Sequence, residues 1–466
     1  MARSLSSLFE VQDMTSGTPM SGLIRFSLPL LIGNFAQQLY NTVDSMIVGK
    51  YIGDTALAAV GTSGPILNLM IVLFLGIATG AGILSAQFFG AKEKDRLSQL
   101  CGSAIIMTFL SGLIMSFIGY FTASFMISLM APPEQVGIGA VTYLQIIFLG
   151  MIGSAAYNIF SGILRGMGDS VHPLIYLVIA SLLNIVLDLF FVRNLALGIA
   201  GVAWATIIAQ AVSGALCLIR MFRMKDVVVI DAHSFVPDMR LVGKLVSLGL
   251  PAGITSAIFS LSSIIVQNLT NSMGEMMIAA NVAVMKVDGF VMLPNFTFGT
   301  AITTYVGQNI GAGKTERIRP GTRDMMKLAL ICAGALVTSI LLFGRGLISM
   351  FTDTESVIML GARGLRWLAF GYLTFAVSQV LQGVMRGAGE TVIPMWISVF
   401  TTVILRMPLA YVLAAMTRSD LWPTGHPDAI FSSLLISWTV TMMLSIFFYR
   451  KGNWKKHLPE SMREAI

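Results

Sequence analysis

The residues best suited to chemistry are carboxylic acids inside long apolar segments, beginning with Asp44. Asn34, Gln37 and Asn41 precede it at spacings of three, four and three residues, which place all four on one face of a helix. Charged groups at membrane depth are costly and usually functional. We therefore expect this face to bind an ion or a polar substrate.

A second such face carries Asn184 and Asp188. Asp169 and Asp188 are 19 positions apart, as are Arg25 and Asp44, so the acids at 44 and 188 are expected at similar depth. Paired carboxyls in an apolar pocket can hold a proton, or a monovalent cation with help from neutral oxygens. The alternative is that neighbouring amides satisfy the acids. The predicted cation site consists of Asp44, Asn184, Asp188 and Thr206. Taken alone, Thr206 could instead hydrogen-bond its own helix.

The second half of the chain has its own charged residues at depth, Lys286, Asp288 and Arg406. Lys286 and Asp288 are two residues apart and point to different faces of a helix. One interpretation is a structural ion pair between Asp288 and Arg406. The other is that this polar cluster lines a cavity and biases the charge of the substrate.

Composition indicates a membrane protein, because 55% of the residues are hydrophobic and only 11% are charged. Apolar runs of about 20 residues recur along the chain, without the alternation of a membrane barrel. The predicted fold is therefore an all-α, polytopic membrane protein with twelve transmembrane helices in two six-helix lobes. The predicted spans are 23–46, 56–82, 100–124, 136–160, 174–193, 197–220, 243–270, 277–306, 326–348, 357–380, 392–416 and 429–449.

Lysine and arginine gather in alternate loops, on the side that also holds both termini, which predicts cytoplasmic termini and a multi-pass protein of the plasma (inner) membrane. The net charge of +7 then reflects topology rather than nucleic-acid binding. The predicted organisation is a first lobe at 1–220, a cytoplasmic linker at 221–242 and a second lobe at 243–466. A lipid-embedded monomer is expected.

The two halves repeat each other. The stretch from Gly162 to Pro173 and the stretch from Gly383 to Pro394 share seven positions at an offset of 221 residues. Asp44 and Asp188 correspond to Val266 and Leu409, so the acids are not duplicated. We therefore predict a symmetric scaffold with an asymmetric ion site in the first lobe. The shared glycines, acid and proline predict tight turns that cap the next helix.

No cofactor is predicted. The three cysteines and four histidines are scattered without metal-ligand spacing, and the expected coupling ion, a proton or sodium, is the only ion that the site would bind. An enzyme is not expected, since no nucleophile, metal or base cluster appears at membrane depth.

The order of several motifs resembles the multidrug and toxic compound extrusion (MATE) family of secondary transporters over essentially the whole chain. The motifs are Leu28-Pro29 with Asp44, Gln87 to Ala91, Arg165 to Asp169, Val306 to Gly313, and Arg406 to Tyr411. The resemblance implies an antiporter that exports organic, often cationic, drugs or metabolites in exchange for protons or sodium by alternating access.

In the prokaryotic branch with a first-lobe ion site, the family's ion-binding residues match Asp44, Asn184, Asp188 and Thr206, and substrate-binding residues are expected at Asn41, Tyr143 and Asn158. The seventh and tenth helices lack the acids of another branch. The alternative is a lipid-linked precursor flippase of the same superfamily. A channel or an uncoupled scaffold would need a continuous polar stripe, which the sequence does not show.

Overall fold

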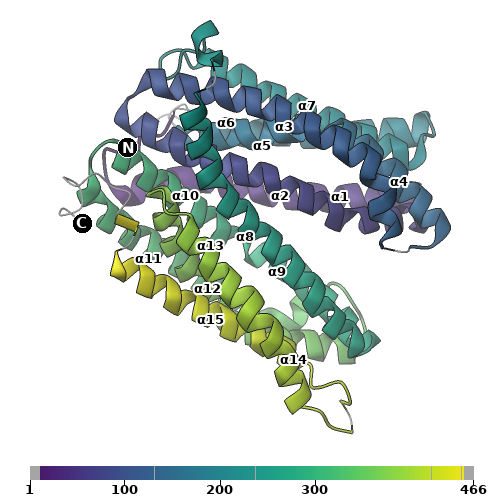
Figure 1. Cartoon of the computed structure of the whole chain (residues 1–466). Helices are drawn as coiled ribbons and strands as arrows, with labels where there is room; N and C mark the ends of the chain where they lie inside the picture. The colour runs from purple at the N-terminus through teal and green to yellow at the C-terminus, as the bar shows by residue number, and fades with distance from the viewer. Residues whose placement is uncertain (1–10, 131, 237, 421, 453, 456–466) are drawn as a thin grey trace. The chain divides into compact units, whose positions relative to one another are not determined.

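The computed structural model describes residues 11–130, 132–236, 238–420, 422–452 and 454–455, and these are almost entirely helical (Figure 1). Twelve long helical segments follow one another, several of them divided. They are α1 (Pro19–Tyr51), α2 (Asp54–Ala91), α3 (Lys94–Ser128), α4 (Glu134–Leu149) with α5 (Met151–Gly166), α6 (Val171–Leu189) with η2 (Phe190–Asn194), α7 (Gly198–Arg223), α8 (Met239–Ser272), α9 (Glu275–Val291) with α10 (Leu293–Gly311), η4 (Thr315–Arg317) with α11 (Ile318–Ser349), α12 (Glu355–Gly387), α13 (Val392–Val399) with η5 (Phe400–Arg406) and α14 (Met407–Met416), and α15 (Asp428–Lys451).

Ten of these segments are long and apolar enough to cross a membrane. The pair α4 and α5 adds an eleventh, bent by 54° where Gly150 separates the two helices. The twelfth predicted span lies in α1, whose 33 residues are long enough but include the polar residues of the Asp44 face. The chain is a multi-pass membrane protein.

Contacts divide the chain into two units. The described residues within Met1–Ser16 and Ile24–Gly253 form the first, and those within Gly17–Leu23 and Ile254–Ile466 form the second. In the first unit, α5 packs against α2, α3 and α7, and α6 packs against α7. In the second unit, α12 packs against α9, α10, α11 and α15. Each unit therefore has one central helix, α5 or α12.

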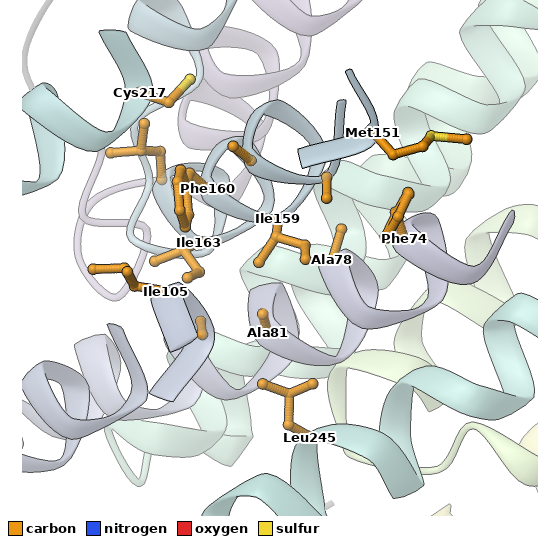
Figure 2. Packing of buried hydrophobic residues seen from close by; sticks show 14 of the residues in the cluster. Phe74, Ala78, Ala81, Ile105, Met151, Ile159, Phe160, Ile163, Cys217 and Leu245 are labelled. Atoms are coloured by element: carbon orange, nitrogen blue, oxygen red, sulfur yellow. The ribbon is translucent and has the colours of Figure 1, made fainter. Parts of the chain in front are cut away.

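The first unit is held together by an apolar core around α5. Figure 2 shows Phe74 and Ala78 of α2 with Ile159, Phe160 and Ile163 of α5, all nearly inaccessible to solvent. The free cysteine Cys217 belongs to the same core. The second unit has a separate core that includes residues of α9, α12 and α15.

The segment between α7 and α8 packs against the first unit. The one-turn helix η3 (Ala232–Phe235) is capped by Asp231, whose Oδ1 accepts from the backbone N of Ser234 at 3.0 Å. The backbone N of Val229 donates to Ser98 Oγ of α3 at 3.1 Å. This segment, predicted as a linker at 221–242, thus begins after Arg223, ends before Met239 and lies against α3.

Candidate functional site

The two predicted acids meet inside the first unit. Asp44 lies on α1 and Asp188 near the end of α6, and their carboxyl groups are close enough to share a hydrogen bond. Asp188 is fully buried, and one oxygen of each carboxyl is buried without any other partner. Two carboxyls can form such a bond only if one carries a proton, so the arrangement favours one proton, or one bound cation, between them.

Asn184 ties this acid pair to α7. With its amide oriented to satisfy its hydrogen bonds, Nδ2 donates to Asp188 Oδ2 at 2.7 Å and to Tyr40 Oη at 3.3 Å. Its Oδ1 accepts from the backbone N of Thr206 at 3.1 Å. Asn184 and Asp188 share a face of α6 because they are four residues apart. The amide therefore holds the Asp188 carboxylate in a fixed orientation.

Thr206 is in the cluster, but its hydroxyl is also engaged with its own helix. Thr206 Oγ1 donates to the carbonyl oxygen of Val202 at 2.9 Å and interacts with the Tyr40 hydroxyl. The four predicted cation-site residues are therefore brought together, with Thr206 contributing its backbone N–H and a hydroxyl oxygen that can accept.

A pocket adjoins the cluster between α1, α6 and α7. Its lining is mixed polar and apolar: Tyr40, Leu177, Ala180, Ser181, Thr206, Ala209, Gln210 and Ser213. Gln210 Oε1 is buried there without a hydrogen-bond partner. Tyr40 and Thr206 border both the pocket and the Asn184 network, so a small polar species in the pocket would lie next to that network.

No cation neutralises the acid pair in the part of the chain that the structure describes. Neither Asp44 nor Asp188 has a lysine, arginine or histidine within 4.0 Å, and the only charged group acting on Asp188 is Asp44. Carboxyl oxygens buried without a cationic partner are costly, and a bound positive charge would offset that cost.

The three predicted substrate-binding residues lie in different surroundings. Asn41 is exposed on α1, three residues before Asp44. Tyr143 of α4 is 5% exposed and lies near both acids, inside the unit. Asn158 of α5 donates from Nδ2 to the carbonyl oxygen of Ser154 at 2.9 Å, within its own helix. Their role in substrate binding stays a prediction.

In the second unit, the first of the two interpretations, an ion pair between Asp288 and Arg406, does not match the structure, and the second stays open. Among the described residues, no nitrogen of Arg406 comes within 4.0 Å of an Asp288 oxygen, although the two charges interact at longer range. Asp288 instead faces the hydroxyl of Tyr372. Arg406 is the last residue of η5, a wider helical turn in which the backbone does not follow the α-helical register. Lys286 is exposed on the other side of α9, as the spacing predicted.

Sequence reasoning missed Tyr40, Gln210 and Ser213. The pattern that could have found them is present: Tyr40 precedes Asp44 by four residues, and Thr206, Gln210 and Ser213 follow one another at spacings of four and three. Each set shares one helix face. The described residues contain no cluster of three potential metal ligands.

Comparison with known proteins places the chain in a family. The family model described as MatE matches twice, over residues 29–190 and 251–412, one match in each half. "Probable multidrug resistance protein YoeA" of Bacillus subtilis is 30% identical over 441 residues, covering 92% of this chain and 93% of that relative. "Probable multidrug resistance protein NorM" of Thermotoga maritima is 25% identical, covering 93% of each chain.

Solved structures agree on the fold. "Crystal structure of MATE in the straight conformation" superposes with a TM-score of 0.88 at 23% identity, covering 96% of this chain and 99% of that one. "Outward-facing conformation of a multidrug resistance MATE family transporter of the MOP superfamily" gives the same TM-score. Such structures have twelve helices in two lobes, and members of the family are transporters, not enzymes. The chain therefore belongs to the MatE family of multidrug efflux transporters.

Proposed function

We propose that the chain is a secondary active antiporter that exports organic, often cationic, compounds in exchange for an ion bound between Asp44 and Asp188. The observation that carries the proposal is the meeting of these two acids, each with a buried oxygen and without a cationic partner among the described residues. A site built this way binds a cation from one side of the membrane and releases it to the other when its surroundings change.

A proton is the coupling ion that the hydrogen bonds favour. Sodium needs several oxygen ligands beyond the two carboxyls. The Asn184 carbonyl oxygen already accepts from the Thr206 N–H, and the Thr206 hydroxyl donates to Val202. A proton needs only the two carboxyls, which already lie within hydrogen-bonding reach of each other. Sodium coupling remains the other outcome of the experiment.

The test is uptake of a cationic dye such as ethidium into proteoliposomes, with imposed proton and sodium gradients applied separately. Asp44→Asn and Asp188→Asn should each reduce gradient-driven uptake by at least about tenfold, because one carboxyl alone cannot hold the shared ion. Asp95→Asn, which changes an exposed aspartate at the start of α3, should transport at the normal rate. Uptake that ignores both gradients, or undiminished coupling in both site variants, would overturn the proposal.

The proposal includes the oligomeric state, the membrane and the orientation of the chain. We expect a monomer in the plasma membrane with both termini cytoplasmic, as the distribution of lysine and arginine predicts. The names of the relatives describe multidrug resistance, which supports drug or metabolite export and does not favour a lipid flippase. Labelling of single cysteines in loops by a membrane-impermeant reagent tests the orientation.

A further inference from the structure

The second unit contains ionisable side chains that the proposed ion site does not use. Asp288 of α9, Tyr372 of α12 and Arg406 at the end of η5 approach one another from three separate helical segments. Their neighbours Val287, Leu368 and Ala410 belong to the apolar core of that unit. Charged groups are rarely placed in such a core without a function.

The hydrogen bonds of this cluster are incomplete. Asp288 Oδ1, the Tyr372 hydroxyl and Arg406 Nε are all buried, and none has a hydrogen-bond partner that meets normal geometry. The carboxyl and the hydroxyl interact without reaching that geometry, and the guanidinium lies more than 4.0 Å from the carboxyl. Such unmet groups are costly, so a purely structural ion pair would be expected to close this gap.

Arg406 ends a helical turn that is wound more widely than an α-helix. η5 spans Phe400–Arg406, and its wider winding frees backbone carbonyls. Neighbouring serines bind two of them: Ser437 Oγ donates to the Thr401 carbonyl at 2.8 Å, and Ser262 Oγ donates to the Thr402 carbonyl at 3.5 Å. A return to regular α-helix would rotate the end of this segment and move Arg406 relative to Asp288.

Few other groups act on Asp288. α10, α11 and α12 pack against α9, and Tyr372 of α12 is the ionisable group from these helices that reaches the carboxyl in the described part of the chain. Arg406 of η5 is the one cation that acts on it, and Lys286 faces away on the exposed side of α9. The charge of Asp288 is therefore controlled by the separation of a single guanidinium.

The first half has no copy of this cluster. At the offset of 221, Asp288, Tyr372 and Arg406 correspond to Leu67, Met151 and Ile185. The acid pair of the first unit is likewise absent from the second half. Each half thus carries its own ionisable cluster at positions where the other half is apolar.

We propose that Asp288, Tyr372 and Arg406 form a second protonation site, in which Asp288 holds a proton while Arg406 is separated from it and releases the proton when Arg406 pairs with the carboxylate. The proton bonds to a carboxyl oxygen and leaves as hydronium, and the guanidinium replaces it as the positive partner. The site rests on the proposed antiport and adds a second proton to each transport cycle.

The experiment counts protons per dye molecule. Purified protein in proteoliposomes transports ethidium while an enclosed pH-sensitive fluorophore reports the protons that move. In Asp288→Asn, the number of protons per ethidium should fall by about half while ethidium transport persists, because the Asp44 and Asp188 site is intact. Val287→Ala, beside it on α9, should leave the proton count unchanged.

A double variant separates this role from a structural one. If Asp288 and Arg406 only stabilise the fold, Asp288→Asn lowers the melting temperature, Arg406→Gln restores it in the double variant, and the proton count stays normal in all of them. An unchanged count in folded Asp288→Asn protein overturns the inference. If the unaltered protein moves no protons with ethidium, the proposed proton coupling itself fails. Asp44→Asn identifies that case, because it then leaves the proton count unchanged.

Discussion

Two turns, one within 162–173 between α5 and α6 and one within 383–394 between α12 and α13, allow the halves of the chain to be compared residue by residue. In the first, the backbone N of Gly168 donates to the Arg165 carbonyl at 3.0 Å; in the second, Gly389 donates to Arg386 at 2.9 Å. Both glycines have a φ of 91°, a conformation that favours glycine. The backbone of the turn is thus the same in both copies.

The acidic residues of the two turns have different partners. Asp169 Oδ2 accepts from Arg220 Nε of α7 at 3.0 Å, and its Oδ1 lies 2.8 Å from His172 Nδ1. Glu390 Oε1 accepts from the backbone N of Val392 and of Ile393, both at 2.9 Å. Both acids accept from the backbone of the helix that follows, Asp169 from the backbone N of His172 at 3.2 Å. Asp169 in addition binds Arg220 and so links that helix to α7. Duplication kept the backbone and the cap, and the first copy adds this ion pair.

The largest effect is expected where the two copies agree. A Cβ on Gly166 would lie less than 3.0 Å from the carbonyl oxygen of Gly82, and one on Gly387 would lie less than 3.0 Å from that of Thr303. Gly166→Leu and Gly387→Leu should each destabilise the protein by about 3 kcal/mol or more, since backbone cannot move aside cheaply. Loss of the monodisperse peak in fluorescence-detected size exclusion is the measurement.

The control for both glycines is Gly346→Leu on α11, where an added Cβ meets nothing within 4 Å. It should elute normally. If only one of the two turn variants fails to fold, the close helix approach is not equally important in the two halves.

An intermediate effect should distinguish the acids. Asp169→Asn removes the charge that binds Arg220 and should cost about 1–3 kcal/mol, because Asp169 is only 2% exposed. Glu390→Gln weakens a helix cap and should cost about 0.5–1 kcal/mol. Melting temperatures in detergent compare the two, and equal losses would contradict a bridging role for Asp169.

The pH dependence of stability gives a second test of the role of Asp169. Burial raises the pKa of Asp169, but hydrogen bonds and charge from His172 and the charge of Arg220 outweigh burial and hold that pKa below the ordinary value of 3.8. The lowered pKa means that the carboxylate stabilises the folded protein fully above that ordinary value, and this stability is lost as the pH falls through the lower, folded value. Asp169→Asn should therefore be less sensitive to pH below about 4 than the unaltered protein.

The smallest effect is expected at the ends of α2 and α10. Lys92 and Gly313, at the offset of 221, have positive φ angles of 59° and 70°. Lys92→Gly should stabilise the protein by about 0.5–1 kcal/mol, because a side chain is strained in this conformation. Gly313→Lys should destabilise it by a similar amount, and opposite shifts in melting temperature are the expected result. Shifts of the same sign would contradict the equivalence of the two turns.

Much of the fold follows from local patterns. Apolar runs predicted the helices, and the Gly, acid and Pro positions predicted the turns at Asp169 and Glu390, with Pro173 and Pro394 in the first turn of the next helix. The bend of 54° between α4 and α5 was not predicted. Gly150 has a counterpart at the same offset, Gly371, inside the unbroken α12, so glycine alone does not break a helix. Packing of the surrounding helices decides whether a helix breaks at such a glycine.

The candidate site likewise has features that the sequence predicted and features that it did not. Helical spacing identified the polar faces of Asp44 and of Asn184 with Asp188, and the failed repeat at Val266 and Leu409 indicated that they belong to one half. These inferences need only the period of a helix and the cost of a charge in lipid.

Which faces meet depended on the tertiary structure. α1, α6 and α7 bring the two acids to each other and give Asn184 its partners, and Arg406 at the end of η5 lies beyond ion-pair distance of Asp288. The reason is physical: a sequence pattern sets the direction of each side chain about its own helix axis. The distance between side chains on different helices depends on packing and on local changes of helical winding, which involve many residues far apart in the chain.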